Sequence, residues 1–383
     1  MQEIKSIKDA EVKGKRVLVR VDFNVPLDVL AGEVRVLDDS RIKAALPTIK
    51  FLHEQGATKI ILLTHVGRPE GVAVESLRTA PLTAVLRTFV DYPEIEMHEN
   101  VRFDPREEAN DESFAKELSS LGDVFVNEAF PVSHRSDASI VGVPKFLPSY
   151  AGLRFIEEIE KLTPALTPPK NSLAIIGGAK FETKQPLIEK LVSLYGHVLL
   201  CGALANDLLK SHGLPVGASL VSDMPMPTSL AENVQILAPV DVVVEGEVAR
   251  AAHTADVRKD ERIVDIGVGT AVAWAEEIKK AEFVLWNGPA GIYEKGFVQG
   301  TDALAEAVVN STCKAVIGGG DTAAALAKYT FDPARIFIST GGGAMLEFLT
   351  HGTLPGIEVL GRSPLAVTGR ARPTGETLTN SAE

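Results

Sequence analysis

Two glycine-rich segments in the second half of the chain each combine a turn with a carboxylate. Residues 286–294 read Trp-Asn-Gly-Pro-Ala-Gly-Ile-Tyr-Glu, and residues 318–322 read Gly-Gly-Gly-Asp-Thr. Each follows a short apolar run, at 283–286 and 315–317, that is typical of a buried strand. In open parallel sheets, ligands bind beyond the carboxyl ends of strands, where glycine admits phosphate and the next helix offers free N–H groups. One such segment alone would indicate an ordinary turn, but two together indicate a phosphate-binding edge.

Two lysines follow a third glycine turn, in Gly-Gly-Ala-Lys-Phe-Glu-Thr-Lys at 177–184. Their spacing of four predicts that Lys180 and Lys184 share one helical face, roughly 5.4 Å apart along the axis. Lysine beside a glycine-rich strand end is suited to phosphate, although two exposed surface lysines are the plain alternative. The turn lacks the GxxxxGK[ST] pattern, and the chain lacks a GxGxxG dinucleotide fingerprint.

The first half places cations and polar groups at the ends of its expected strands. Because the planar fork of arginine binds phosphate and carboxylate oxygens in bidentate fashion, several arginines at one sheet edge would hold a small polyanion. Any one of them alone would more simply be a solvated surface residue. The group consists of Asp22, Phe23, Asn24, Arg41, His65, Val66, Gly67, Arg68, Arg102 and Arg135.

The elements that must position these residues alternate between strand and helix, which predicts the α/β class with parallel sheets covered by helices on both faces. Strands are expected at 16–23, 58–64, 123–126, 172–176, 197–201, 242–245, 283–286, 314–317 and 335–339. Helices are expected at 42–54, 107–121, 153–162, 183–194, 270–280, 301–309 and 322–328.

A length of 383 residues favours two domains. We expect a first domain at 1–150 and a second at 170–361. Between them, 151–169 combines a charged amphipathic helix with a proline-rich end, as in a semi-rigid linker. The polar tail at 362–383 is expected to be loosely held or to return to the first domain.

The composition limits the classes of partner and compartment. A net charge of −12 argues against nucleic acid as the main partner. Cys201 and Cys313 are too few for a disulfide framework and lie in apolar surroundings, which indicates buried thiols in a reducing compartment. No signal peptide or apolar run long enough to span a bilayer is evident, so a cytoplasmic protein without membrane contact is expected.

In order along the chain, seven segments resemble the signature segments of the phosphoglycerate kinase family, and they extend over nearly its whole length. They lie at 19–26, 65–68, 100–103, 177–180, 286–294, 318–322 and 340–343. The resemblance implies a monomeric hinge-bending kinase with two Rossmann-like three-layer α/β/α domains joined by a helix. It also implies reversible in-line transfer between 1,3-bisphosphoglycerate and MgADP, giving 3-phosphoglycerate and MgATP in glycolysis.

The resemblance assigns roles to the candidate residues. It implies that the ten residues of the first half bind the triose, and that Arg41 and Lys180 serve the transfer itself. The implied nucleotide site consists of Lys184, Gly202, Glu294, Gly319, Gly320, Asp321 and Thr322. Within it, Asp321 would hold Mg²⁺ through oxygen, as hard cations prefer, and Glu294 would accept hydrogen bonds from ribose hydroxyls.

The sequence departs from the family pattern in two places. Where the family usually reads Gly-Thr-Ala-His-Arg-Ala-His, residues 131–137 read Pro-Val-Ser-His-Arg-Ser-Asp, which leaves open a kinase acting on a different carboxylate. Where it usually reads Gly-Gly-Gly-Met-Ala, residues 201–205 read Cys-Gly-Ala-Leu-Ala, and the added Cβ atoms bear on the preferred nucleotide base. A non-catalytic nucleotide-binding relative is the alternative from another class of protein.

Overall fold

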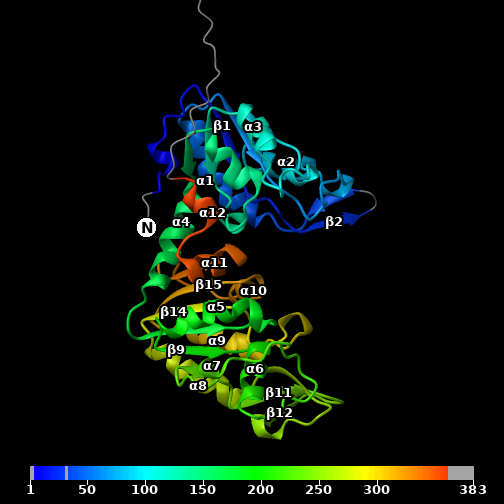
Figure 1. The fold of residues 1–383 in the computed structure, drawn as a ribbon, viewed down its shortest axis with the longest axis vertical. Coiled ribbons are helices and arrows are strands. Elements are labelled where there is room, and N and C mark those ends of the chain that lie inside the picture. The colour runs from blue at the N-terminus through cyan, green and yellow to red at the C-terminus, as the bar shows by residue number, and fades with distance from the viewer. Residues whose placement is uncertain (1–3, 31–32, 361–383) are drawn as a thin grey trace, which may run out of the picture. The chain divides into compact units, whose positions relative to one another are not determined.

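The structure is a computed structural model that describes residues 4–30 and 33–360 (Figure 1). The chain divides into two compact units. The N-terminal unit contains residues 4–127, 136–151 and 358–360, and the C-terminal unit contains 128–135 and 152–357. The domain limits expected from the sequence stay a prediction, and the expectation for the tail at 362–383 lies outside the described residues.

A five-stranded parallel sheet forms the centre of the N-terminal unit, in the order β5-β4-β1-β6-β7. Its strands are β1 (Arg16–Arg20), β4 (Lys59–Leu63), β5 (Ile95–Met97), β6 (Val124–Asn127) and β7 (Ser149–Ala151). From β1 the chain builds outward to β4 and β5, and then resumes on the other side with β6 and β7. The direction therefore switches between β1 and β6, the kind of point where open α/β sheets bind ligands.

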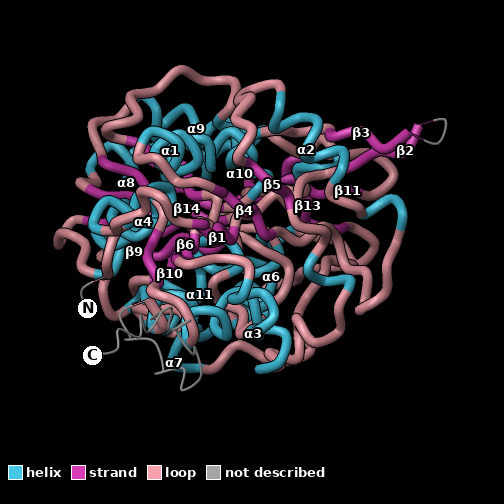
Figure 2. Tube along the Cα trace, turned by 90° about the horizontal axis from the view of Figure 1, so that it is seen from above, coloured by secondary structure: helices cyan, strands magenta, loops and turns pink. Residues whose placement is uncertain are grey.

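Helices and a hairpin complete this unit. The helices are α1 (Ser40–Glu54), α2 (Ala80–Arg87) and α3 (Glu112–Ser120). Phe114 and Leu118 of α3 pack on one face of the sheet with Leu18 and Phe125. The antiparallel hairpin of β2 (Leu27–Leu30) and β3 (Glu33–Val36) extends away from the sheet of its unit (Figure 2).

The C-terminal unit contains a six-stranded parallel sheet in the order β10-β9-β8-β14-β15-β16. Its strands are β8 (Ser172–Ile176), β9 (His197–Leu200), β10 (Ile236–Leu237), β14 (Phe283–Asn287), β15 (Lys314–Gly318) and β16 (Ile336–Ser339). The chain builds outward from β8 to β10 and then from β14 to β16 on the other side. The switch point of this sheet therefore lies between β8 and β14.

The chain from residue 153 to residue 358 also contains the following helices. They are α4 (Leu153–Leu162), α5 (Phe181–Val192), α6 (Ala203–Ser211), α7 (Thr228–Ala231), α8 (Val268–Lys280), α9 (Gln299–Asn310), α10 (Gly320–Leu326), α11 (Gly343–His351) and α12 (Pro355–Glu358). Trp274 of α8 and Leu304 of α9 pack with Ile175, Trp286 and Ile317, which lie at the same register position on three neighbouring strands. Because such residues share one face of a sheet, α8 and α9 cover the same face. No helix within the described residues is both long and apolar enough to cross a membrane.

Most of the expected strands and helices are present, with ends that differ by up to three residues, but two elements differ more. The strand expected at 242–245 exists as β11 (Asp241–Glu245), but it belongs to a separate antiparallel sheet with β12 (Arg250–His253) and β13 (Arg262–Ile266). The helix expected at 107–121 begins only at Glu112. The Asp111 side chain accepts hydrogen bonds from the backbone N–H groups of Ser113 and Phe114, and this cap fixes the start of the helix.

Candidate functional site

Two glycine turns meet at the switch point of the C-terminal sheet. Gly177 and Gly178 follow β8, while Gly288 follows β14 with φ of +94°. A Cβ atom built on Gly177 would lie 2.4 Å from the carbonyl oxygen of Pro289, and one on Gly288 would lie 2.7 Å from that of Gly177. The two turns therefore pack backbone against backbone, which only residues without a side chain allow.

Lys184 is the cation that the fold directs at this switch point. It lies in the second turn of α5, and its Nζ donates to Oδ1 of Asn287 at the end of β14, at 2.5 Å. Burial lowers the pKa of Lys184 to about 8, against a smaller opposing effect of the nearby Cys201 thiol. A lysine with this pKa is charged at neutral pH but is held by only one uncharged partner among the described residues. The ammonium group of Lys184 is therefore well suited to binding an anionic ligand.

The prediction that Lys180 and Lys184 share a helical face is wrong. Lys180 caps α5 with extended backbone angles, φ −129° and ψ 110°, so only Lys184 is helical. The reason is local: the glycine turn after β8, with Gly178 at a φ of +148°, leads into the extended Lys180, and the helix starts only at Phe181. Lys180 is exposed at the end of this turn.

The second glycine-rich segment forms the turn between β15 and α10. Gly319 has a φ of +104°, and the buried hydroxyl of Thr322 accepts a hydrogen bond from the N–H of Gly288 at 3.1 Å. This bond ties the β14 and β15 turns together. Gly320 and Asp321 open α10 and are exposed. The predicted phosphate-binding segments thus lie at neighbouring strand ends.

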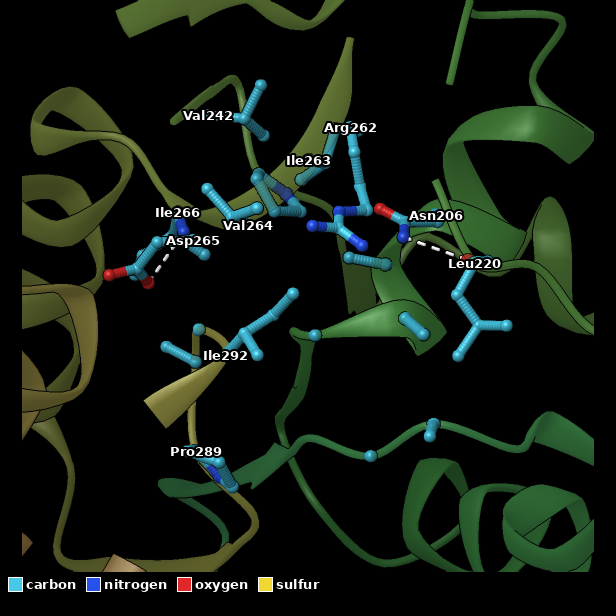
Figure 3. Close-up of a pocket in the computed structure, with 18 of the residues that line it drawn as sticks. Asn206, Leu220, Val242, Arg262, Ile263, Val264, Asp265, Ile266, Pro289 and Ile292 are labelled. Carbon is cyan, nitrogen blue, oxygen red and sulfur yellow. Dashed lines mark hydrogen bonds between the residues drawn. The ribbon is translucent and has the colours of Figure 1, made fainter. Parts of the chain in front are cut away.

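A cavity of about 320 Å³ adjoins these turns (Figure 3). Of the predicted nucleotide residues, the structure brings Gly202, Glu294 and Asp321 together in its lining, beside Gly178 and Gly291. Much of the remaining wall is apolar and comes from Leu220, Val242, Ile263, Val264 and Ile266. A mostly apolar pocket with a few polar groups and a glycine-rich rim is typical of a small-ligand site.

Sequence reasoning missed three polar residues that line this cavity, Asn206, Arg262 and Asp265. Asp265 is buried in β13, and burial raises its pKa to about 6 although Gly300 and Ile266 donate backbone hydrogen bonds to it. Arg262 forms an ion pair with Glu245 of the same small sheet. For Asp265, the sequence did offer a signal, because an aspartate stands inside the otherwise apolar run Ile-Val-Asp-Ile at 263–266.

The fit of Mg²⁺ can be judged from the carboxylates present. No group of three or more His, Cys, Asp or Glu side chains that could hold a metal occurs among the described residues. Asp321 is a single exposed carboxylate near the glycine turns. Because Mg²⁺ keeps several waters and is usually held by one or two carboxylates together with substrate phosphates, this arrangement fits a metal that arrives with a nucleotide.

In the N-terminal unit, the residues after β1 and β4 form a connected polar edge. Arg41 of α1 forms an ion pair with Asp22, whose side chain is buried. Asn24 accepts a hydrogen bond from the N–H of Gly67 at 2.9 Å, and Arg102 donates to the carbonyl oxygen of Gly67 at 3.0 Å. The structure thus brings together Asp22, Asn24, Arg41, Gly67 and Arg102 at one edge, as predicted residues of a polyanion site.

His65 lies on a buried network beneath this edge. Nη2 of Arg20 lies 3.2 Å from Nδ1 of His65, and Nε of Arg20 donates to Ser139, which donates to Glu107. Since a guanidinium can only donate, Nδ1 must accept, and the ring presents an N–H donor at Nε2. Burial raises the pKa of Glu107. Arg20, Glu107 and Ser139 were missed because their burial depends on the tertiary fold.

The other predicted residues of the first half lie in different settings. Phe23 is fully buried, so only its backbone is available, and Val66 accepts from Asn100 at 2.8 Å. Arg68 is exposed without a side-chain partner among the described residues. Arg135 belongs to residues 128–135, which group with the C-terminal unit, so the polar edge described above does not include it.

Asp137, which departs from the family pattern, lies in the N-terminal unit. It is buried, and its Oδ2 atom is 3.8 Å from Nη2 of Arg102. The carboxylate of Asp137 therefore lies beside Arg102, one of the cations predicted to bind the triose.

Two α/β units, each built on a parallel sheet, one with a cationic edge and the other with a glycine-rich pocket, are typical of the class of two-domain kinases. The family described as phosphoglycerate kinase matches residues 7–352. A phosphoglycerate kinase of Roseiflexus sp. (strain RS-1) is 40% identical over 394 residues, covering 93% of this chain and 98% of that protein. One from Moorella thermoacetica is 41% identical over 391 residues, with the same coverage of both chains.

Solved structures of phosphoglycerate kinases are also similar to this chain. The phosphoglycerate kinase of Coxiella burnetii has a TM-score of 0.81 and 36% identity, covering 94% of this chain and 99% of that chain. The enzyme of Pyrococcus horikoshii OT3 has a TM-score of 0.79 and 28% identity, covering 93% and 98%. The chain belongs to the phosphoglycerate kinase family. The family, the fold class and the kinase function predicted from the sequence are thereby confirmed.

Proposed function

We propose that the chain transfers a phosphoryl group reversibly between 1,3-bisphosphoglycerate and MgADP, giving 3-phosphoglycerate and MgATP in glycolysis. The observation that carries the proposal is the family match over residues 7–352, which includes the ligand edges of both sheets with their charged residues intact. A copy that had lost catalysis would have no need of Arg41, Lys180, Lys184, Glu294 and Asp321 together.

The C-terminal unit supplies the proposed nucleotide site. Lys184 holds the nucleotide phosphates, and its single neutral hydrogen-bond partner, Asn287, supports that role. The backbone of Gly319 and Gly320 approaches the phosphates, while Thr322 holds the β14 and β15 turns in place. Gly202 and Glu294 line the cavity, where Glu294 accepts hydrogen bonds from the ribose. Asp321 holds Mg²⁺ together with phosphate oxygens.

The N-terminal unit supplies the proposed triose site. Arg102 and Arg68 bind anionic oxygens, with Arg135 as a further cation from residues 128–135. His65 donates from Nε2, the ring nitrogen opposite the contact with Arg20. Asp22 and Asn24 accept from the hydroxyl group of the triose, with Phe23, Val66 and Gly67 contributing the backbone that shapes this edge.

Arg41 and Lys180 act on the transferred group. Phosphoryl transfer needs little covalent help from a protein, and its rate comes from positioning and from stabilising the charge spread over the equatorial oxygens. The two cationic side chains neutralise that charge, with direct in-line transfer from donor to acceptor. The exposed position of Lys180 and the partly exposed side chain of Arg41 leave both cations accessible to a ligand.

The remaining assignments follow from the same proposal. The partners are the small-molecule substrates and Mg²⁺, and the protein acts as a monomer in the cytoplasm without nucleic-acid or membrane contacts.

A coupled assay tests this function. With 3-phosphoglycerate and MgATP, we expect formation of ADP that depends on both substrates and on Mg²⁺. Other phosphorylated carboxylic acids, supplied at the same concentration, serve as the control for acceptor choice. A clear preference for another acid, or no turnover with any acid, would contradict the proposal.

A further inference from the structure

The start of α5, which lies between Lys180 and Lys184, is capped from a distant part of the chain. Lys180 occupies the N-cap position, and its side chain forms no capping hydrogen bond. The first N–H groups of a helix have no acceptor within the helix and need one from elsewhere. For Phe181, the first residue of α5, this acceptor is Oγ of Ser222, at 2.9 Å. A hydroxyl group 41 positions further along the chain therefore fixes where α5 begins.

Asp207 fixes the direction of the Ser222 hydroxyl group. It lies in α6 and is only 6% exposed. Its Oδ1 accepts from the N–H of Ser222 at 2.8 Å, and its Oδ2 accepts from the Ser222 hydroxyl at 2.9 Å. Because an ionised carboxylate can only accept, the hydroxyl hydrogen points to Asp207, and a lone pair of Oγ remains for Phe181. The three groups form one chain of hydrogen bonds from the start of α5 to α6.

The peptide group that joins Lys180 to Phe181 is the part of the backbone that this chain of bonds holds. Its N–H donates to Ser222, and its carbonyl oxygen accepts from the hydroxyl of Thr183 at 3.0 Å. A peptide group is planar, so fixing its orientation also fixes ψ of the residue before it. The ring of Phe181 is fully buried and fixes the position of that residue. The hydrogen bond to Ser222 adds the direction in which Lys180 leaves it.

The chain before Lys180 has more freedom than the chain after it. Upstream, the carbonyl oxygen of Gly178 accepts from the N–H of Leu204 at 3.3 Å. Ala179 and Lys180 follow, and both are exposed. Glycine adopts many backbone conformations, so Gly178, with a φ of +148°, does not by itself hold the course of the chain. The downstream contact with Ser222 is therefore expected to govern where the Lys180 ammonium group lies.

We infer that Ser222, oriented by Asp207, is a positioning residue for Lys180 in phosphoryl transfer. This inference rests on the proposed function, in which Lys180 neutralises charge on the transferred group. A charged group accelerates a reaction only where it meets the developing charge, and a small displacement lowers the rate. Lys184 is held separately, by its hydrogen bond to Asn287. Loss of the Ser222 hydroxyl should therefore lower kcat without weakening the binding of ADP.

Kinetics with 3-phosphoglycerate and MgATP, together with calorimetry of ADP, test this separation. Ser222→Ala should lower kcat about tenfold, the size expected for one lost hydrogen bond, and change the dissociation constant of ADP by less than about threefold. Ser222→Thr keeps a hydroxyl group and should stay within about threefold of the wild-type kcat. Ser193→Ala is the matched control, because Ser193 ends the same helix and its hydroxyl donates to the carbonyl oxygen of Lys190 at 2.6 Å. It should change kcat by less than about twofold.

A double-mutant cycle shows whether Ser222 acts through Lys180. In a Lys180→Ala background, Ser222→Ala should change the remaining kcat by less than about twofold, because residues that act as a unit are not additive. Asp207→Asn is a second variant for the same cycle, which keeps the test decisive if Ser222→Ala fails to fold. It places an NH₂ group against one of the two donors of Ser222 and should lower kcat about threefold, again only when Lys180 is present.

The outcomes separate this inference from the proposed function. An unchanged kcat in Ser222→Ala, or an equal fall with and without Lys180, would overturn the inference alone. A fall in kcat with an equal loss of ADP affinity would also overturn it, since Ser222 would then support the whole nucleotide site. No turnover of 3-phosphoglycerate by the wild type would overturn the proposed function and this inference with it.

Discussion

The pKa of Lys184 makes nucleotide affinity dependent on pH in a range where most lysines do not titrate. The free protein holds this ammonium half-buried beside Asn287, with a pKa of about 8. A bound diphosphate places negative charge against it and raises the pKa in the complex, because opposite charges favour the ionised form. Binding above pH 8 therefore requires uptake of a proton.

The size of the effect follows from the fraction of free protein that is already charged. With a pKa of about 8, roughly nine tenths of Lys184 is charged at pH 7 and roughly one tenth at pH 9. The dissociation constant of ADP should therefore rise about tenfold between these pH values, equal to about 1.4 kcal/mol. Cys201, its titratable neighbour, has a pKa raised by burial to about 12 and stays neutral over this range.

Isothermal titration calorimetry of MgADP at pH 7, 8 and 9 measures this change. Repeating the titration in buffers of different ionisation enthalpy counts the proton taken up. Lys184→Met is the control, and its affinity should be low at pH 7 and almost independent of pH. An affinity in the wild type that stays constant or increases from pH 7 to pH 9 would refute the reasoning.

Four other predictions concern single residues. Lys184→Ala should weaken ADP binding by roughly 1.5–3 kcal/mol, the range for hydrogen bonds to charged groups, and an unchanged calorimetric affinity would count against its role. Arg41→Ala should lower kcat more than it raises KM, because charge stabilisation is greatest in the transition state; steady-state kinetics with a change in KM alone would contradict this. Asp265 has a folded pKa of about 6, above its unfolded value, so the folded state binds more protons and stability falls as pH rises. In urea unfolding, the Asp265→Asn variant should lose about 2 kcal/mol less stability than the wild type between pH 4 and pH 7. Equal pH dependence of the two proteins would contradict this role of Asp265. Gly177→Ala should lower the free energy of unfolding by about 1–3 kcal/mol through contact with the Pro289 carbonyl, whereas Gly320→Ala, whose Cβ meets nothing within 4 Å, should not; equal stabilities would disprove the close packing of the turns.

The sequence was informative where an apolar run ends in glycine. The strand expected at 172–176 has those limits in the structure, and those at 283–286 and 314–317 extend by one residue. A strand in a sheet that is buried on both faces needs apolar residues at successive positions. The glycine turn that follows such a strand then marks the edge of the sheet where a ligand can bind. The same reasoning placed Lys184, Asp321 and the residues after β1 near strand ends, which is where they lie in the structure.

Features that depend on contacts between distant segments could not be predicted in this way. Residues 242–245 are apolar like the other strands, but nothing local shows that β11 pairs with β12 and β13 in a separate sheet. Lys180 was placed on a helix because spacing alone does not reveal where a helix begins. Ser222 is an ordinary polar residue in the sequence, and its contacts with Phe181 and Asp207 emerge only when α5 and α6 are assembled.

A rapid-quench single turnover tests the central claim, direct transfer from nucleotide to a carboxylate, most directly. The enzyme would be mixed in excess with Mg²⁺ and ATP labelled in its γ-phosphate, with and without 3-phosphoglycerate, and the label would be separated into acyl phosphate, inorganic phosphate and protein. We predict label in the acyl phosphate only when 3-phosphoglycerate is present, and none on the protein. Label released as inorganic phosphate irrespective of the acid, or retained on the protein, would contradict the account.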